Sequence, residues 1–290
     1  MIAESLAGKR IAITGSTGFV GTALVERMLR SVPDCELVLL VRDGKRTPAA
    51  KRTQREILKN NAFDRLRESH GAPDATETFA EMTGRRITTI AGDVSRDGLD
   101  LNDTDREIFA SCSAVIHSAA AVSFDSPLNS AVEINLLGPV RIAELCNQLE
   151  ITPHIVAVST CYVAGNRRGR APEELVSEGP WDIGLDWRNE VASARRLKGD
   201  TEAISRTRDN LERFRKEARG ELGAAGAPAL AAKTEQLRER WVRAELVDAG
   251  RSRAASLGWP DAYAYTKALG EQALTEVKGP VPVSIVRPSI

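Results

Sequence analysis

Residues 10–21 read RIAITGSTGFVG, an apolar β-branched run that leads directly into three evenly spaced glycines. Glycines at such a turn let the backbone bend sharply and let a pyrophosphate approach the free N–H groups at the start of a helix. Apolar residues then recur at helical spacing, namely Val20, Leu24, Val25, Met28 and Leu29. This order of strand, glycine turn and amphipathic helix predicts the first βα unit of a dinucleotide-binding sheet.

Similar apolar runs recur along the chain, and longer segments of helical period separate them. The runs lie at residues 36–41, 86–94, 114–120, 154–160 and 282–288. They are nearly continuous in apolar residues, as expected for strands that helices cover on both faces. The sequence therefore predicts an α/β fold built on a doubly wound parallel sheet of the Rossmann type.

Residues 186–257 break this alternation, because they are rich in Arg, Glu and Ala and nearly free of strand-forming residues. Two apolar stripes run through them at helical spacing: Leu197, Ile204, Leu211, Phe214 and Ala218 form the first, and Leu230, Leu237, Trp241 and Ala244 the second. The glycine-rich stretch at 220–228 lies between the stripes, so we expect a hairpin of two helices.

The expected organisation is a dinucleotide-binding domain over residues 1–185, a helical-hairpin insertion over 186–257, and a return to the first domain over 258–290. The last segment would supply a catalytic helix and the final strand. Whether the insertion braces the domain or forms a lid over a site stays open.

Composition narrows the class of protein. With 40 Lys and Arg against 40 Asp and Glu in 290 residues, the formal net charge is +0, so no overall field attracts nucleic acid. A hydrophobic fraction of 42% supports a folded core. The cysteines lack metal-ligand spacing, the N-terminus lacks an export signal, and no apolar run reaches the roughly 20 residues of a membrane span. We therefore expect a cytoplasmic protein with reduced thiols and no metal, with peripheral membrane contact left open.

The end of the second predicted strand bears on the choice of cofactor. Sites for NAD place an acidic residue here for the ribose hydroxyls, whereas an arginine suits the additional phosphate of NADP. The chain has Arg42 at this point, and Lys45 and Arg46 follow closely. We therefore expect NADPH rather than NADH. Asp43, one position later, keeps NAD open, and the same residues also fit an ordinary charged loop.

The segment DAYAYTKALGE at residues 261–271 carries a second motif. Tyr263 and Lys267 are four residues apart, so on a helix they share a face, where the ammonium favours the phenolate. Such a pair makes a phenol usable as a proton donor near neutral pH. Ser159 and Thr160 follow the fifth predicted strand, where their hydroxyls would orient a substrate carbonyl. The plain alternative is an amphipathic helix with a packed tyrosine.

Together these motifs resemble those of the extended short-chain dehydrogenases/reductases, and more closely those of the fatty acyl-CoA reductases. The stretches that carry the finer resemblance occur in order along the chain: TGSTGFVG, LLVRDGKRTPAAKR, FDRLRE, HSAAAVSFD, VSTCYV, YAYTKALGE and SIVRPSI. The reductase domains of carboxylic acid reductases and of peptide-synthetase terminal modules share much of this pattern.

The resemblance implies which residues bind the cofactor. They would be Gly15, Ser16, Thr17, Gly18, Phe19, Val20, Gly21, Arg42, Asp93, Val94, Ala119, Ala120, Pro288 and Ser289, together with Tyr263 and Lys267. The glycines would hold the pyrophosphate and Arg42 the adenosine phosphate. Asp93 and Val94 would flank the adenine, the two alanines would line the ribose side, and Pro288 and Ser289 would approach the nicotinamide.

The resemblance also implies the reaction, which is hydride delivery from NADPH to the thioester carbonyl of a long-chain acyl-CoA or another acyl thioester. Tyr263 would be the acid, Lys267 would tune the phenol and hold the nicotinamide ribose, and Thr160 or Ser159 would bind the carbonyl. The product would be an aldehyde, and a second hydride would give an alcohol. Relatives continue beyond RPSI into a substrate lobe, so we expect this lobe to be missing or truncated here.

Two other functions stay open. An extended short-chain sugar-nucleotide epimerase or dehydratase would share the cofactor-binding residues, although the YTKALGE context and the helical insertion count against it. A truncated cofactor-binding module without activity would also explain the glycine turn, although the pairing of Tyr263 with Lys267 counts against it.

Overall fold

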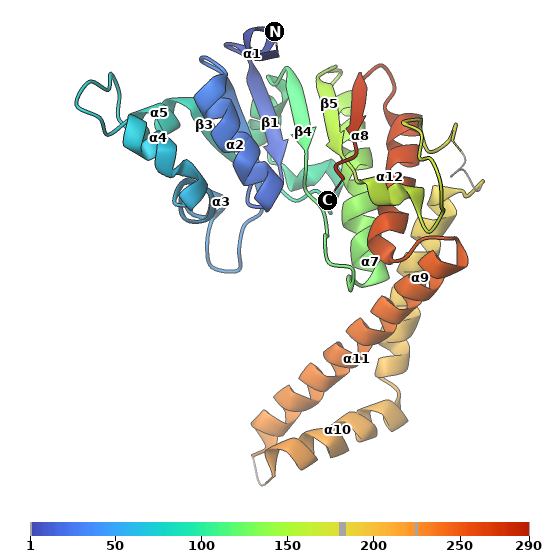
Figure 1. Cartoon of the computed structure of the whole chain (residues 1–290). Helices are drawn as coiled ribbons and strands as arrows, with labels where there is room; N and C mark the ends of the chain where they lie inside the picture. Colours follow the sequence, from blue (N-terminus) through green and yellow to red (C-terminus); the bar gives the residue numbers. More distant parts are fainter. Residues whose placement is uncertain (1, 180–183, 224–225, 290) are drawn as a thin grey trace. The chain divides into compact units, whose positions relative to one another are not determined.

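The structure is a computed structural model, and it describes residues 2–179, 184–223 and 226–289 (Figure 1). The strands are β1 (Arg10–Thr14), β2 (Glu36–Val41), β3 (Ile87–Ala91), β4 (Ala114–His117), β5 (His154–Val158) and β6 (Val283–Val286). The α-helices are α1 (Ile2–Leu6), α2 (Phe19–Ser31), α3 (Ala49–Arg52), α4 (Asp64–Ser69), α5 (Phe79–Arg86), α6 (Asp103–Ala110), α7 (Leu128–Ala131), α8 (Leu137–Gln148), α9 (Trp187–Ser205), α10 (Arg208–Leu222), α11 (Ala227–Ser256) and α12 (Ala262–Val277). Short 3-10 or π-helical turns are η1 (Thr53–Leu58), η2 (Asn61–Phe63), η3 (Asp97–Asp100), η4 (Val132–Leu136) and η5 (Cys161–Ala164).

The strands form one parallel sheet in the order β3-β2-β1-β4-β5-β6. The chain builds outward from β1 through β2 to β3, and it then returns to the other side of β1 for β4, β5 and β6. The strand order therefore reverses between β1 and β4, and doubly wound sheets bind their ligands at the carboxyl ends of the strands at such a point. The predicted α/β fold with a doubly wound parallel sheet is confirmed.

Successive residues of the central strands point to opposite faces of the sheet, and each face has its own apolar core. In β1, Ile11 and Ile13 join the core that includes α2, whereas Ala12 joins the core that includes α8. None of the three is more than 1% exposed. Because both faces are covered, the strands read as continuous apolar runs in the sequence.

Some elements are shorter than the runs that predicted them. The run at 86–94 yields β3 over Ile87–Ala91, because α5 continues to Arg86, and the run at 282–288 yields β6 over Val283–Val286. Val20, which we expected on the buried face of α2, is exposed. It lies in the first turn of the helix, ahead of Gly21, which is the first buried residue of α2.

The chain forms two compact units. The first unit comprises Met1–Ala120, Ile134–Cys161 and Gly270–Ile290, and the second comprises Ala121–Glu133 and Tyr162–Leu269. The first contains the sheet. The predicted insertion at 186–257 lies within the second, and α12 begins in the second unit and ends in the first.

In the second unit, the predicted hairpin is present, but the segment holds three helices where we expected two. α9 ends at Ser205 and α10 begins at Arg208, so the first predicted stripe is divided. Arg238 of α11 fastens the end of α9, because its buried guanidinium donates to Ser205 Oγ and to Glu202, each at 2.9 Å. Ile204, which the stripe assigned to a buried face, is 51% exposed.

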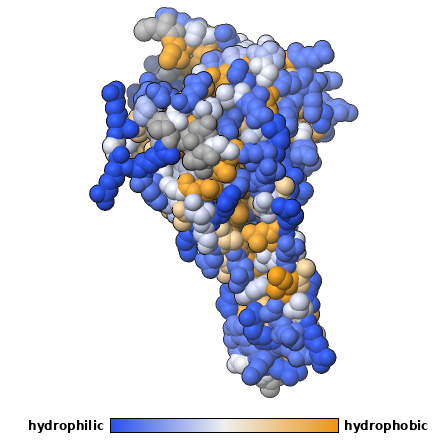
Figure 2. Space-filling model, turned by 90° about the vertical axis from the view of Figure 1, so that its right-hand side faces the viewer, coloured by the Kyte–Doolittle hydropathy of each residue, from blue (hydrophilic) through white to orange (hydrophobic). Residues whose placement is uncertain are grey.

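The hairpin of α10 and α11 has a small apolar core of its own, formed by Phe214, Ala218, Leu237, Leu230 and Trp241. Around it, Figure 2 shows hydrophilic residues over most of the visible surface and apolar residues only in small separate groups. No helix in the described part of the chain combines the length and the apolar character that crossing a membrane requires. Residues 224 and 225 of the predicted turn lie outside the described residues.

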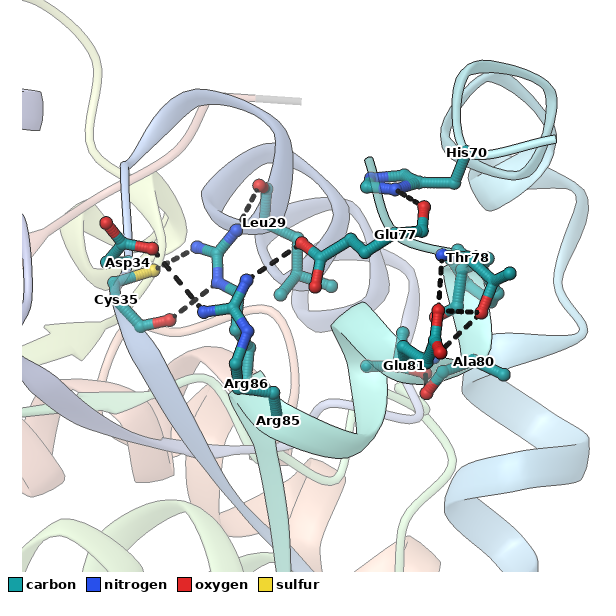
Figure 3. Close-up of polar contacts among 12 residues, drawn as sticks. Leu29, Asp34, Cys35, His70, Glu77, Thr78, Ala80, Glu81, Arg85 and Arg86 are labelled. Atoms are coloured by element: carbon teal, nitrogen blue, oxygen red, sulfur yellow. Dashed lines mark hydrogen bonds and ion pairs between the residues drawn. The ribbon is translucent and has the colours of Figure 1, made fainter. Parts of the chain in front are cut away.

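A buried arginine closes the carboxyl end of α2 (Figure 3). Arg86 is 7% exposed and donates to the carbonyl oxygens of Leu29 (2.7 Å), Val32 (2.7 Å) and Cys35 (2.9 Å). The last carbonyl groups of a helix have no partner within that helix, so this guanidinium satisfies acceptors that would otherwise be buried without one. Because Cys35 immediately precedes β2, Arg86 also fixes the path from α2 into β2.

We expect Arg86→Ala to lower the free energy of unfolding by about 3 kcal/mol, because it leaves several buried carbonyl groups unsatisfied. Arg85→Ala is the matched control, since the Arg85 side chain is 52% exposed and pairs with Glu77 and Asp34 at the surface. This variant should lose far less stability than Arg86→Ala, because ion pairs at the surface contribute little. Urea unfolding of the two variants tests this, and equal losses would contradict the role given to Arg86.

Candidate active site

Glycine is required at two positions of the turn between β1 and α2. Gly15 has a φ of +74°, and a Cβ there would lie 2.5 Å from the backbone nitrogen of Ala119. A Cβ at Gly21 would lie 2.2 Å from the carbonyl oxygen of Gly15. Both distances are far shorter than van der Waals contact, so a side chain at either position would push the turn apart. The turn therefore packs directly on the segment that follows β4, where the strand order reverses.

The start of α2 is open to an anion. Gly18 is the N-cap residue and has no side chain to accept from the first N–H groups, and the first turn of α2 holds no acidic residue. Ser16 is 1% exposed, and its hydroxyl has no hydrogen-bond partner among the described residues. Uncapped N–H groups, the positive end of the helix dipole and a buried hydroxyl together suit a pyrophosphate. The residues of this turn therefore fit a dinucleotide.

Hydrogen bonds join the end of β4 to the end of β1. Thr14 Oγ1 lies 2.8 Å from His117 Nδ1, and the Ser118 hydroxyl donates to the Thr14 carbonyl oxygen at 2.8 Å. The Ala119 N–H donates to Thr14 Oγ1 at 3.3 Å. These contacts fix Ala119, and Ala120 after it, beside the glycine turn. The structure thus brings together the glycines and the alanines that we predicted to share one cofactor.

The carboxyl ends of β2 and β3 bring Arg42 and Asp93 together, with Nη1 of Arg42 3.9 Å from Oδ2 of Asp93. The Arg42 side chain is 59% exposed, so its guanidinium is accessible to a ligand. Asp43 is engaged elsewhere, because its carboxylate accepts the N–H of Ala49 at the start of α3 at 2.7 Å. Arg42 is therefore the better placed of the two neighbours to meet an adenosine phosphate.

Asp93 and Val94 lie in a closely bonded loop after β3. The Asp93 carboxylate accepts the N–H and the hydroxyl of Ser95, each at 2.8 Å, and the Asp93 N–H donates to the Leu99 carbonyl oxygen at 2.8 Å. Val94 is buried. The loop therefore holds both predicted adenine neighbours at the same edge of the sheet as Arg42.

The segment that follows β5 runs beside the segment that follows β6. The Ser159 N–H donates to the Val286 carbonyl oxygen at 2.7 Å, and the Cys161 N–H donates to that of Pro288 at 3.1 Å. Ser159 and Thr160 are both buried, and the Ser159 hydroxyl has no hydrogen-bond partner within the described part of the chain. The predicted carbonyl-binding residues and Pro288 thus share one edge of the first unit.

An ion pair anchors this last segment to α12. Arg287 Nη2 lies 2.5 Å from Oε2 of Glu271, and the two side chains are 17% and 4% exposed. A guanidinium that donates two hydrogen bonds to one buried carboxylate fixes the relative orientation of the two side chains as well as the distance between them. Ser289 follows as an exposed residue, and Ile290, which ends the RPSI motif, lies outside the described residues.

The predicted catalytic helix is present as α12. The Asp261 carboxylate caps its first turn by accepting the N–H of Ala264 at 2.8 Å. Tyr263 and Lys267 lie one turn apart, and Lys267 is 6% exposed. The ring of Tyr263 packs edge to face with that of Phe124, with the ring centroids 6.0 Å apart. The helical spacing therefore places the phenol and the ammonium on one face.

The predicted catalytic residues come from both units. Ser159 and Thr160 belong to the first unit, and Tyr263 and Lys267 belong to the second. Each pair is described within its own unit, so their assembly into one site stays a prediction.

Tyr265 lies between Tyr263 and Lys267, and no sequence motif assigned it a role. Tyr265 is 1% exposed and its hydroxyl donates to the carboxylate of Glu190 on α9, which Arg253 of α11 also binds. Burial raises the pKa of Tyr265, and the hydrogen bond to Glu190 raises it further. The second tyrosine of YAYTK was a possible signal of this contact, because residues two positions apart on a helix point to opposite sides of it.

Comparison with known proteins now identifies the family. The family described as "Male sterility protein", a family of NAD-binding domains, matches residues 13–290. The chain is 31% identical over 297 residues to "Fatty acyl-CoA reductase 2, chloroplastic" of Arabidopsis thaliana, and 32% identical over 296 residues to "Alcohol-forming fatty acyl-CoA reductase" of Simmondsia chinensis. The chain belongs to the fatty acyl-CoA reductase family. The two alignments cover 100% of this chain but 42% and 52% of the relatives, so it spans about half their length.

A solved structure agrees with the fold. The terminal R domain from the myxalamid PKS-NRPS biosynthetic pathway aligns with a TM-score of 0.53 and 21% identity, over 97% of this chain and 48% of that one. The family resemblance inferred from the sequence motifs is confirmed. Family membership also makes this an NAD(P)-binding domain, in agreement with the geometry of the glycine turn.

We expect Gly15→Ala to weaken the binding of NADPH or NADH at least about tenfold, because the new Cβ would displace the Ala119 backbone. Gly84→Ala on α5 is the control, since a Cβ there meets nothing within 4 Å. Cofactor titration followed by protein fluorescence measures both. If both variants stay folded and bind equally well, the turn is not where the pyrophosphate lies.

Proposed function

We propose that this chain binds NADPH and, as part of a fatty acyl-CoA reductase, reduces an acyl-CoA thioester to an aldehyde, with further reduction to an alcohol as a second step. The observation that carries the cofactor assignment is the uncapped start of α2 beside the buried Ser16 hydroxyl. The names of the two plant relatives support the substrate class. NADPH supplies the hydride when it is bound.

Different residues of the chain would bind different parts of NADPH. Gly15, Gly18 and the first N–H groups of α2 would hold the pyrophosphate, and Arg42 would meet the adenosine phosphate. Lys267 would hold the nicotinamide ribose and favour the phenolate form of Tyr263. In these assignments, backbone N–H groups bind the pyrophosphate, which NADH and NADPH share. The Arg42 side chain binds the additional phosphate that only NADPH carries.

Tyr263 would stabilise the oxyanion that develops on the thioester carbonyl and then supply its proton. Ser159 or Thr160 would donate a second hydrogen bond to the same oxygen, and the open hydroxyl of Ser159 favours this residue. The hemithioacetal so formed loses CoA as the thiol and leaves the aldehyde. The hydroxyl proton of the hemithioacetal passes to the departing CoA sulfur, and Tyr263 regains its proton from solvent.

Arg42→Ala tests the cofactor preference. Loss of a charged contact to the adenosine phosphate should weaken NADPH binding about tenfold or more and leave NADH binding nearly unchanged. Arg85→Ala, at an exposed position on α5, is the control. Equal losses for the two cofactors in Arg42→Ala would count against NADPH selection by this residue.

Tyr263→Phe tests the reaction. We expect the purified chain to consume NADPH with a long-chain acyl-CoA and to release CoA thiol, and the variant to lose about a hundredfold in kcat while still binding NADPH. A sugar nucleotide offered in place of the thioester is the matched control substrate. Tight NADPH binding by the wild-type chain with no thioester turnover would identify it as a cofactor-binding module instead.

A further inference from the structure

A second tyrosine of the YAYTK motif joins α12 to two helices of the insertion. Tyr265 and Tyr263 are two residues apart, so they lie about 200° apart around the helix. The Tyr265 hydroxyl donates to Oε2 of Glu190 on α9. Arg253 of α11 donates to the same carboxylate through Nε at 3.0 Å and Nη2 at 2.5 Å. One carboxylate thus ties α9, α11 and α12 together within the second unit.

Glu190 is held as a charged acceptor in this network. Its side chain is 11% exposed, and both of its oxygens receive hydrogen bonds. Burial by itself raises the pKa of Glu190, but the hydrogen bonds from Arg253 and Tyr265 outweigh it and hold the pKa below its ordinary value. A buried carboxylate with a forked guanidinium accepts only one orientation of its partners, whereas apolar contacts allow helices to slide.

The corner between α11 and α12 is fixed by packing as well. The Trp259 indole N–H donates to the Val163 carbonyl oxygen at 2.9 Å, and the Trp259 ring lies 5.8 Å from that of Tyr265. A Cβ at Gly250 would lie only 3.2 Å from the Cβ of Ala262, so α11 and the start of α12 are in close contact. The first two turns of α12 therefore have little freedom to rotate or shift.

We propose that Tyr265, Glu190 and Arg253 are positioning residues that set the rotation of the first two turns of α12 and thereby hold Tyr263 and Lys267 in place. The helical insertion then acts as a brace for the proton donor. This proposal rests on the proposed function only in taking Tyr263 as that donor. The network reaches Tyr263 through the helix backbone, from the side opposite the phenol.

The test compares Tyr265→Phe and Glu190→Gln with a matched control. Tyr265→Phe keeps the ring and the Glu190–Arg253 pair, and Glu190→Gln removes the charge at the centre of the network. Arg240→Gln is the control, because Arg240 lies on α11 like Arg253 but pairs with Glu217 of α10 (3.0 Å) at an exposed position outside the network. The melting temperature of each variant shows whether it folds.

Fluorine NMR provides a readout that does not depend on turnover. The chain has 3 tyrosines, Tyr162, Tyr263 and Tyr265, so labelling with meta-fluorotyrosine gives few signals, which single Phe variants assign. If the network positions Tyr263, the fluorine chemical shift of Tyr263 should change in Tyr265→Phe and in Glu190→Gln, because the surroundings of its ring change. Arg240→Gln should leave it unchanged.

Every outcome of this comparison either supports or contradicts the positioning role. An unmoved Tyr263 signal in folded variants, or the same shift in Arg240→Gln, would overturn the proposal and leave the network a purely stabilising one. If Glu190→Gln fails to fold, Tyr265→Phe alone decides. If the wild-type chain shows no turnover but the Tyr263 signal shifts, the proposed reaction fails while the positioning role stands.

Kinetics give a second readout where the reaction is observed. Misplacement of the proton donor should lower kcat of Tyr265→Phe about tenfold, whereas Arg240→Gln should keep the wild-type kcat and the wild-type KM for NADPH. A parallel rise in KM and fall in kcat, matched by Arg240→Gln, would indicate general loosening and contradict the positioning role.

Discussion

β1 pairs with β2 on one side and with β4 on the other, and the first unit is organised around this double pairing. Thr14, the last residue of β1, lies opposite both Leu40 and His117. Because β1 lies between β2 and β4, the chain that follows Thr14 passes close to the segment after β4. Gly15 packs there against the backbone of Ala119. Only a residue without a Cβ fits there, so the sheet order and the glycine at position 15 depend on each other.

The same constraint explains what the sequence could reveal. Strands covered on both faces must be apolar throughout, so their runs were visible, and the glycine spacing reflects contacts within a few residues of the turn. The Tyr263 and Lys267 motif is local for the same reason, because one helical turn separates its members. Family resemblance then assigned roles to residues that no spacing rule connects, such as Arg42 and Asp93, and the structure places these two side by side.

Features that depend on distant pairs were not predictable in this way. Glu190 lies 63 positions from Arg253 and 75 from Tyr265, and no periodic pattern links them. The break between α9 and α10 was missed because a continuous apolar stripe predicts one helix, whereas the end of α9 is held by Arg238 of another helix. Asp43 looked available to a ribose until the structure showed its bond to Ala49.

Buried and half-exposed arginines recur as connectors. Arg86 binds carbonyl groups at the end of α2, Arg238 joins α11 to α9, and Arg253 binds the Glu190 carboxylate. A planar guanidinium can serve several acceptors at once in fixed directions, which lysine cannot. These three arginines therefore fix where neighbouring elements of the fold meet.

The two anion-binding groups proposed at the sheet edge differ in kind. Backbone N–H groups at the start of α2 would bind a pyrophosphate by direct hydrogen bonds at contact distance. A guanidinium that is 59% exposed acts through water, in which charges are screened over about 8 Å at physiological ionic strength. On the role proposed for Arg42, rising salt should therefore lower the preference for NADPH over NADH sooner than it lowers the affinity for either cofactor.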